Sequence, residues 1–205
     1  MNGRLLRAAR HGLLAVALVC GGTFVLAHLR AELFTLIEED RLASVLAGGE
    51  LEAPGSSPAA AARTRDEARP GRAWGRFDLP RLGLSALVAE GVDDATLGVA
   101  IGHVPGSAFP GERGNVALAG HRDTVFRLLE EVRPEDVLRL VTPDGVFEYR
   151  VEWLAIVDPG RTDVLTSTDE PQLTLVTCYP FEYVGSAPLR YVVRARSVGR
   201  AAAGA

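Results

Sequence analysis

The stretch that decides the fold of this chain is Gln172-Leu173-Thr174-Leu175-Val176-Thr177-Cys178. Its apolar and β-branched residues are typical of a buried strand. The Tyr179-Pro180 pair that follows ends the strand, because proline has no backbone N–H for a central strand. Cys178 is therefore predicted at a strand end. It is the only cysteine outside an apolar N-terminal segment, which contains Cys20, so we expect a free thiol.

An unpaired cysteine is commonly an inert, buried residue. The catalytic alternative needs partners, because only a few per cent of an ordinary thiol is ionised at neutral pH. His121 follows the apolar stretch Val116-Ala117-Leu118, and Arg190 comes shortly after the cysteine. If these strand ends share one rim, the three residues form a nucleophile, a proton-transfer partner and a clamp for an oxyanion or substrate carbonyl. For a single arginine, a solvated surface charge is the more common role.

Short β-rich segments separated by turns fill the chain from about residue 75 onward. Strands are predicted at 76–79, 85–90, 115–119, 136–141, 146–157, 172–178 and 189–196. Pro143-Asp144-Gly145 indicates a turn, so 137–141 and 146–151 are predicted to pair as a hairpin. Helical pieces are expected at 93–97, 123–131 and 161–165. Many strands with little helix favour a mainly β fold, closed or nearly closed into a barrel.

The N-terminus has the features of an export signal. Arg4, Arg7 and Arg10 precede an apolar stretch at residues 12–29, which is about long enough to span the hydrocarbon core as a helix. We expect residues 1–30 to be an uncleaved, single-pass membrane anchor. Its positive flank predicts a cytoplasmic N-terminus and an extracytoplasmic domain. A signal peptide cleaved after Ala27 is the alternative.

Three further regions are predicted. Residues 31–75 combine a juxtamembrane amphipathic helix at 31–47 with a flexible linker rich in proline, glycine, serine and alanine. Residues 76–198 form the folded, chemistry-bearing domain, and 199–205 form a disordered tail. The formal net charge of −4 does not favour nucleic acid as a partner. No cluster of histidines, cysteines and carboxylates has metal-ligand spacing, so neither a metal nor another cofactor is expected.

The residues around Cys178, His121 and Arg190 resemble the sortase family of cysteine transpeptidases. The residues at 174–178 fit its Thr-Leu-x-Thr-Cys signature, and Gly120-His121 and Arg190 fall where the family has its histidine and arginine. The similarity runs over about residues 77–195. Further motifs look most like class D: Gly102-His103-Val104-Pro105-Gly106, Pro110-Gly111, Gly114-Asn115-Val116, Ala119-Gly120-His121-Arg122-Asp123-Thr124 and Cys178-Tyr179-Pro180-Phe181.

The resemblance implies an eight-stranded β-barrel and a two-step reaction. Cys178 would cleave a sorting signal of the Leu-Pro-x-Thr-Gly kind and form a thioester. His121 would protonate the leaving amine and assist the incoming one, while Arg190 would steady the substrate and the oxyanion. The implied partners are exported proteins with a C-terminal sorting signal, an amine acceptor at the bacterial cell surface, and the membrane.

Three other residues are expected near the substrate: Thr177, His103 and Tyr179. Each has an ordinary alternative, namely a plain strand threonine, a histidine that stabilises its loop by hydrogen bonds, and an aromatic residue of the core. Asp123 would orient His121 or Arg190, although capping of a helix explains it equally well. Two rival functions stay open: a thiol endopeptidase that releases the acyl group to water, and a non-catalytic barrel that binds exported peptides.

Overall fold

The computed structural model describes residues 3–48 and 62–201. The chain divides into two compact units, Met1–Ile37 and Glu38–Ala205, which are described separately. Helix α1, Gly3–Gly48, is continuous, whereas the sequence predicts an anchor and a separate juxtamembrane helix. The helix continues through both predicted segments because no proline, which would break it, occurs before Pro54. The segment Ala9–Ser44, with a mean hydropathy of 2.1, is long and apolar enough to cross a membrane, a test that signal sequences also pass.

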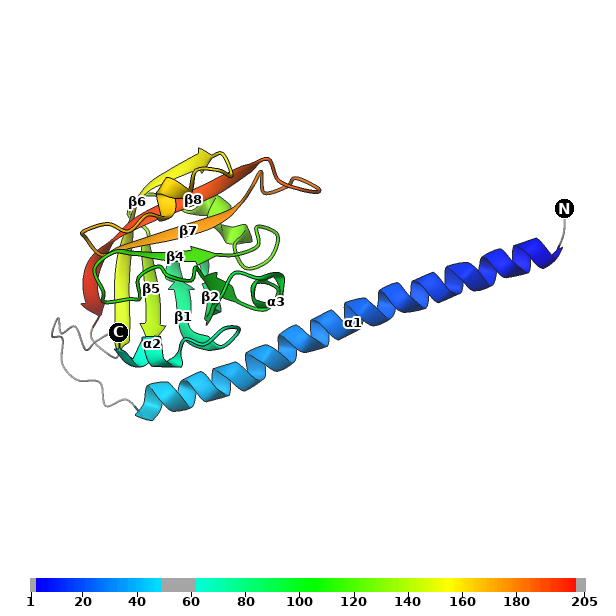
Figure 1. Cartoon of the computed structure of the whole chain (residues 1–205), viewed down its shortest axis with the longest axis horizontal. Helices are drawn as coiled ribbons and strands as arrows, with labels where there is room; N and C mark the ends of the chain where they lie inside the picture. The colour runs from blue at the N-terminus through cyan, green and yellow to red at the C-terminus, as the bar shows by residue number, and fades with distance from the viewer. Residues whose placement is uncertain (1–2, 49–61, 202–205) are drawn as a thin grey trace. The chain divides into compact units, whose positions relative to one another are not determined.

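The second unit is a closed β-barrel with the strand order β1-β2-β3-β4-β7-β8-β6-β5 (Figure 1). The strands are β1 Ala73–Leu79, β2 Leu84–Glu90, β3 Ile101–His103, β4 Asn115–Ala119, β5 Val137–Thr142, β6 Gly145–Val157, β7 Gln172–Tyr179 and β8 Leu189–Ala201. Short helices connect some of them: α2 Ala62–Glu67, η2 Pro80–Leu82, α3 Asp94–Leu97, η3 Arg127–Glu131 and η4 Thr162–Leu165. The predicted fold class, a closed eight-stranded barrel with short helices after an N-terminal apolar helix, is confirmed.

Two local predictions differ from the structure. Strand β3, Ile101–His103, pairs with β2 and β4 but is too short to show a strand period, so the sequence pattern missed it. The helix predicted at 123–131 is a series of turns followed by η3, Arg127–Glu131. The predicted hairpin is confirmed, because β5 and β6 pair from Val137↔Arg150 to Thr142↔Gly145.

Side chains along β7 point alternately into the core and toward the outer surface of the barrel. Leu173 and Leu175 are fully buried members of the core cluster, together with Val193 and Ala195 of β8. Successive side chains of a strand point to opposite faces. Cys178 therefore lies on the other face of β7, outside the barrel core.

The folded unit begins before residue 76 and continues past residue 198, the bounds predicted for the folded domain. Thr64 of α2 donates from its backbone N and its hydroxyl to Asp144 Oδ2, at 2.8 and 2.6 Å. Ala73 and Trp74 are fully buried. Strand β8 continues to Ala201, where it pairs with β6; of the predicted tail, 202–205 lie outside the described residues. Composition suggested a spacer, but these contacts satisfy its polar groups and bury its apolar ones.

Replacing Thr64 by valine is expected to lower the free energy of unfolding by about 1–2 kcal/mol, because the buried Asp144 carboxylate loses a hydrogen-bond donor. Urea unfolding of the detergent-solubilised chain, followed by tryptophan fluorescence, measures this change. Thr166→Val, at an exposed position, is the matched control and is expected to change stability by less than about 0.5 kcal/mol. If the two substitutions change the free energy of unfolding equally, the Thr64–Asp144 hydrogen bonds do not hold α2 to the barrel.

Candidate active site

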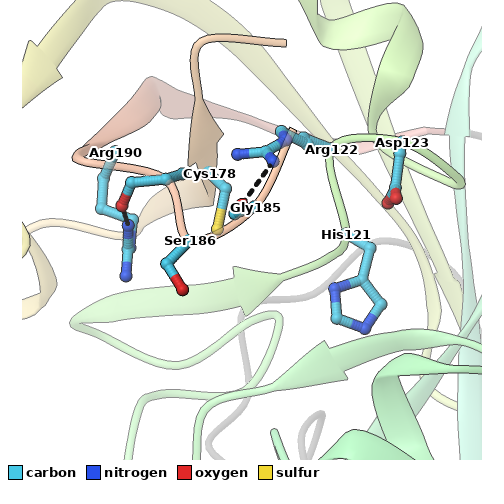
Figure 2. A pocket seen from close by; sticks show the side chains of 8 residues that line it. His121, Arg122, Asp123, Cys178, Gly185, Ser186 and Arg190 are labelled. Carbon is cyan, nitrogen blue, oxygen red and sulfur yellow. Dashed lines mark hydrogen bonds between the residues drawn. The ribbon is translucent and has the colours of Figure 1, made fainter. Parts of the chain in front are cut away.

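A surface cleft of about 330 Å³ lies at the end of β7. It is lined by His121, Arg122, Asp123, Cys178, Gly185, Ser186, Ala187 and Arg190. Figure 2 shows the Cys178 thiol between the His121 imidazole and the Arg190 side chain. The cleft thus brings together the thiol, the imidazole and the guanidinium that the sequence singled out.

Strand pairing brings the histidine and the cysteine to the same end of the barrel. Strands β4 and β7 are parallel, with Ala119 paired to Val176, so His121 and Cys178 each lie two residues beyond a paired position. Gly120 N donates to Val176 O at 3.3 Å. The buried Thr177 hydroxyl donates back to Gly120 O at 2.7 Å. These two hydrogen bonds hold the strand ends together where the cleft opens.

Arg190 reaches the cleft from the opposite neighbour of β7. Strands β7 and β8 are antiparallel, and Cys178 is the register partner of Arg190. The guanidinium Nη1 donates to Leu189 O at 2.9 Å and to Ala187 O at 3.3 Å. In the described part of the chain, no hydrogen bond joins Cys178 to His121 or Arg190. The space between the three side chains is therefore open to a reacting group.

A second hollow, of about 170 Å³, lies under the segment that connects β6 to β7. It is lined by Val157, Asp158, Pro159, Arg161, Thr162, Val164, Leu165, Val176, Arg190 and Val192. Because Arg190 lines both hollows, they adjoin at its side chain. The smaller hollow offers apolar walls next to the cleft that contains the thiol.

A polar network holds one wall of this second hollow. Val164 O accepts hydrogen bonds from Asn115 Nδ2 at 3.3 Å and from Arg194 Nη2 at 2.6 Å. The Thr174 hydroxyl donates to Asn115 Oδ1 at 2.7 Å. Burial lowers the pKa of the Arg194 guanidinium, and the nearby Glu152 carboxylate opposes that shift. The segment containing η4 is thus fixed to the outer surface of β4, β7 and β8.

A family model described as the sortase domain matches residues 77–198, more than half of the chain. The chain belongs to the sortase family. It is 40% identical over 129 residues to Sortase D of Bacillus subtilis (strain 168), which covers 62% of this chain and 65% of that protein. The class D resemblance is therefore confirmed.

Other sortases show the same relationship. The chain is similar to a solved Clostridium perfringens Sortase D5 transpeptidase, with 28% identity, a TM-score of 0.65, and coverage of 80% of this chain and 99% of that one. It is 27% identical over 129 residues to Sortase A of Bacillus anthracis, covering 61% of this chain and 60% of that protein. The chain spans less than two thirds of the length of the curated relatives that it matches.

His103, which is expected near the substrate, does not line the cleft that contains Cys178. It is fully buried, and its Nδ1 lies 2.7 Å from Glu90 Oε2. Its Nε2 lies 2.9 Å from Ser107 Oγ and 3.1 Å from Ala108 O. All its ring contacts are within the fold, so His103 fits the alternative interpretation, a histidine that holds its loop to β2 and β3.

The other two expected substrate contacts are also absent from the lining of both hollows. Thr177 turns its hydroxyl to Gly120 O, which makes it a tie between β4 and β7. Tyr179 stacks on Tyr191, with ring centroids 6.2 Å apart, and meets Phe181 edge-on at 6.0 Å. Sequence reasoning missed Arg122 and Ser186 as cleft residues, because their position depends on the course of the loops. Within residues 3–48 and 62–201, no group of three or more potential metal ligands occurs.

Thr177→Val is expected to slow the alkylation of Cys178 by iodoacetamide by about tenfold at neutral pH. Displacing His121 from Cys178 by even about 1 Å is expected to lower the reaction rate of the thiol. The substitution removes the hydrogen bond that holds Gly120, and with it His121, against β7. Thr177→Ser keeps the hydroxyl and is the matched control, expected to react at nearly the original rate. Rates are read from intact-protein mass spectra. If Thr177→Val and Thr177→Ser are alkylated at the same rate, the hydrogen bond from Thr177 to Gly120 O does not affect the reactivity of Cys178.

Proposed function

We propose that this sortase is a membrane-anchored cysteine transpeptidase. It cleaves exported proteins at a sorting signal of the Leu-Pro-x-Thr-Gly kind and transfers the acyl group to an amine at the cell surface. The observation that carries the proposal is that Cys178, His121 and Arg190 line one cleft in a chain of the sortase family. The catalytic residues are these three, and no cofactor takes part.

In the first step, the Cys178 thiolate attacks the carbonyl carbon of the scissile peptide bond and forms a tetrahedral oxyanion. The C–N bond then breaks as the His121 imidazolium gives its proton to the departing amine. The acyl group is left on sulfur as a thioester. The position of His121 just past the end of β4, and of Cys178 near the end of the parallel strand β7, supports this proton transfer.

In the second step, an amine attacks the thioester carbonyl carbon, and neutral His121 takes the proton that the amine releases. The C–S bond breaks, a new amide forms, and the thiolate is restored. Arg190 donates to the oxyanion or orients the substrate carbonyl, because its planar guanidinium carries several donors at fixed angles. Its present hydrogen bonds to Leu189 O and Ala187 O exchange for bonds to the substrate.

The peptide's apolar residues occupy the second hollow, beside Arg190. Its lining of valine, leucine and proline side chains suits aliphatic side chains, which gain by leaving water. The network through Asn115 and Arg194 keeps this wall in place before the peptide binds. A preformed subsite reduces the entropy lost on binding.

Residues 1–30 anchor the enzyme. The apolar stretch at residues 12–29, within the candidate span Ala9–Ser44, follows Arg4, Arg7 and Arg10, a charge pattern that keeps the N-terminus in the cytoplasm and the barrel outside. The substrate is itself an exported protein held at the membrane by its sorting signal. A tethered enzyme therefore meets its substrate on one surface.

Replacing Cys178 by alanine is expected to reduce cleavage of a Leu-Pro-x-Thr-Gly peptide by at least on the order of 10³-fold, because the acyl acceptor is lost. Mass spectrometry of the products, with triglycine as added amine, measures both cleavage and transfer. Cys20→Ala is the matched control and keeps full activity.

Two outcomes would contradict this proposal. Cleaved peptide without any triglycine adduct would make the chain a thiol endopeptidase. Equal activity of Cys178→Ala and the unmodified chain in cells, at the same protein abundance, would support a barrel that only binds exported peptides.

Replacing Arg190 by lysine is expected to lower kcat/KM by about a hundredfold, the usual cost of losing an oxyanion donor. Lysine keeps the charge but lacks the planar fork. Arg196→Lys, on the same strand and paired with Glu152 at the surface, serves as the control and is expected to leave kcat/KM unchanged. An unchanged kcat/KM in Arg190→Lys would show that Arg190 does not act as the clamp for the oxyanion or the substrate carbonyl.

A further inference from the structure

We propose that Arg122 is a positioning residue that holds the segment between β7 and β8 over Cys178, so that the acyl group passes to an amine in preference to water. This inference rests on the proposed transpeptidase function and assigns a role within it. Arg122 directly follows His121 and lines the same cleft.

Arg122 joins the two sides of the cleft. Its Nη2 donates to Tyr183 O and, at 3.0 Å, to Gly185 O. Its guanidinium carbon lies 5.8 Å from the centre of the Tyr183 ring, within the range of a cation–π contact. Figure 2 shows the guanidinium extending from the His121 side toward Gly185 and Cys178. One side chain thus links the end of β4 to the segment that follows β7.

Near its start, the segment between β7 and β8 is held by Phe181, which is buried in the core cluster, but its tip has few other attachments. Val184 is 95% exposed and Tyr183 is 46% exposed, so its tip is not held by packing. Among the described residues, its remaining hydrogen bonds run from Tyr183 N to Pro180 O and from Arg190 to Ala187 O. The first is within the segment and the second reaches it from the start of β8. Arg122 therefore provides the connection to the rest of the barrel at the tip.

This segment forms a wall of the cleft. Gly185, Ser186 and Ala187 line the cleft together with Cys178. A thioester on Cys178 is consumed either by an amine or by water, and a wall beside it limits the access of water. Holding the wall in place therefore favours transfer over hydrolysis.

The chemistry of arginine suits this position. Its fork of donors reaches two backbone carbonyls at once, which a lysine ammonium on a flexible stem does less well. Its second terminal nitrogen, Nη1, is buried and has no hydrogen-bond partner among the described residues. The neighbouring Asp123 also lines the cleft and forms no ion pair with Arg122 in the described part of the chain.

The test uses the full chain in detergent with a Leu-Pro-x-Thr-Gly peptide and triglycine, and it measures the ratio of hydrolysed to transferred product. Arg122→Met keeps the length of the stem but removes the donors, and it is expected to raise this ratio by about tenfold, in line with the loss of two hydrogen bonds. Arg122→Lys is expected to give an intermediate ratio. Arg76→Met, which removes a surface arginine paired with Asp78 on β1, leaves the ratio unchanged.

A second measurement does not depend on catalysis. In the Cys178→Ala background, Arg122→Met is expected to speed hydrogen exchange at residues 182–187 by about tenfold, because these amides lose the tether. Exchange within β4, β7 and β8 stays as it was, which shows that the barrel remains folded. If Arg122→Met does not fold but Arg122→Lys does, hydrogen exchange at residues 182–187 is compared between Arg122→Lys and the Cys178→Ala parent.

The possible failures are distinguishable. An unchanged product ratio, or unchanged exchange at 182–187, would overturn the role of Arg122. Loss of acylation in Arg122→Met with the same product ratio would make Arg122 a substrate-binding residue, which also overturns it. If the unmodified chain transfers no acyl group at all, the proposed function fails, while the exchange result still reports on the tether.

Discussion

The parallel pairing of β4 with β7 is the constraint on which the rest of this site depends. Two strands that run in the same direction end at the same rim, so the residues after Ala119 and Val176 meet there. Register matters as much as direction, because a shift of one residue would turn Cys178 into the core. Leu173 and Leu175, buried in the barrel, fix that register. The position of the thiol is thus a by-product of hydrophobic packing elsewhere on its strand.

Much of this arrangement could be predicted from the sequence. The apolar run at 172–178 and the proline after it predicted a strand that ends at Cys178, and family motifs supplied His121 and Arg190. Side-chain direction was less accessible, because it depends on which polar partner lies nearest in the folded chain. His103 is buried against Glu90, and Thr177 turns to Gly120 O. A three-residue strand such as β3 has no readable period, so only its neighbours in space define it.

The segment before the barrel shows why composition misled. Residues rich in alanine, glycine and charge suggested a spacer up to residue 75, yet the end of α1 is joined to this part of the chain. Arg41 donates to Glu67 at 2.8 Å and to Ala73 O, and Leu42 is buried. Polar residues fold as well as apolar ones when each finds a partner. Composition considers each residue by itself, so it does not predict contacts between residues that are far apart in the sequence.

Closure of the barrel has a consequence for how any peptide is recognised. A sheet with an open edge can capture an extended chain by adding it as another strand, so that backbone hydrogen bonds supply much of the affinity. A closed sheet leaves no such edge. If the chain acts as we propose, selection between exported substrates falls to side chains on the outer surface and to the connecting loops. Those parts of the chain can change without disturbing the core, so one scaffold can serve different clients through loop variation alone.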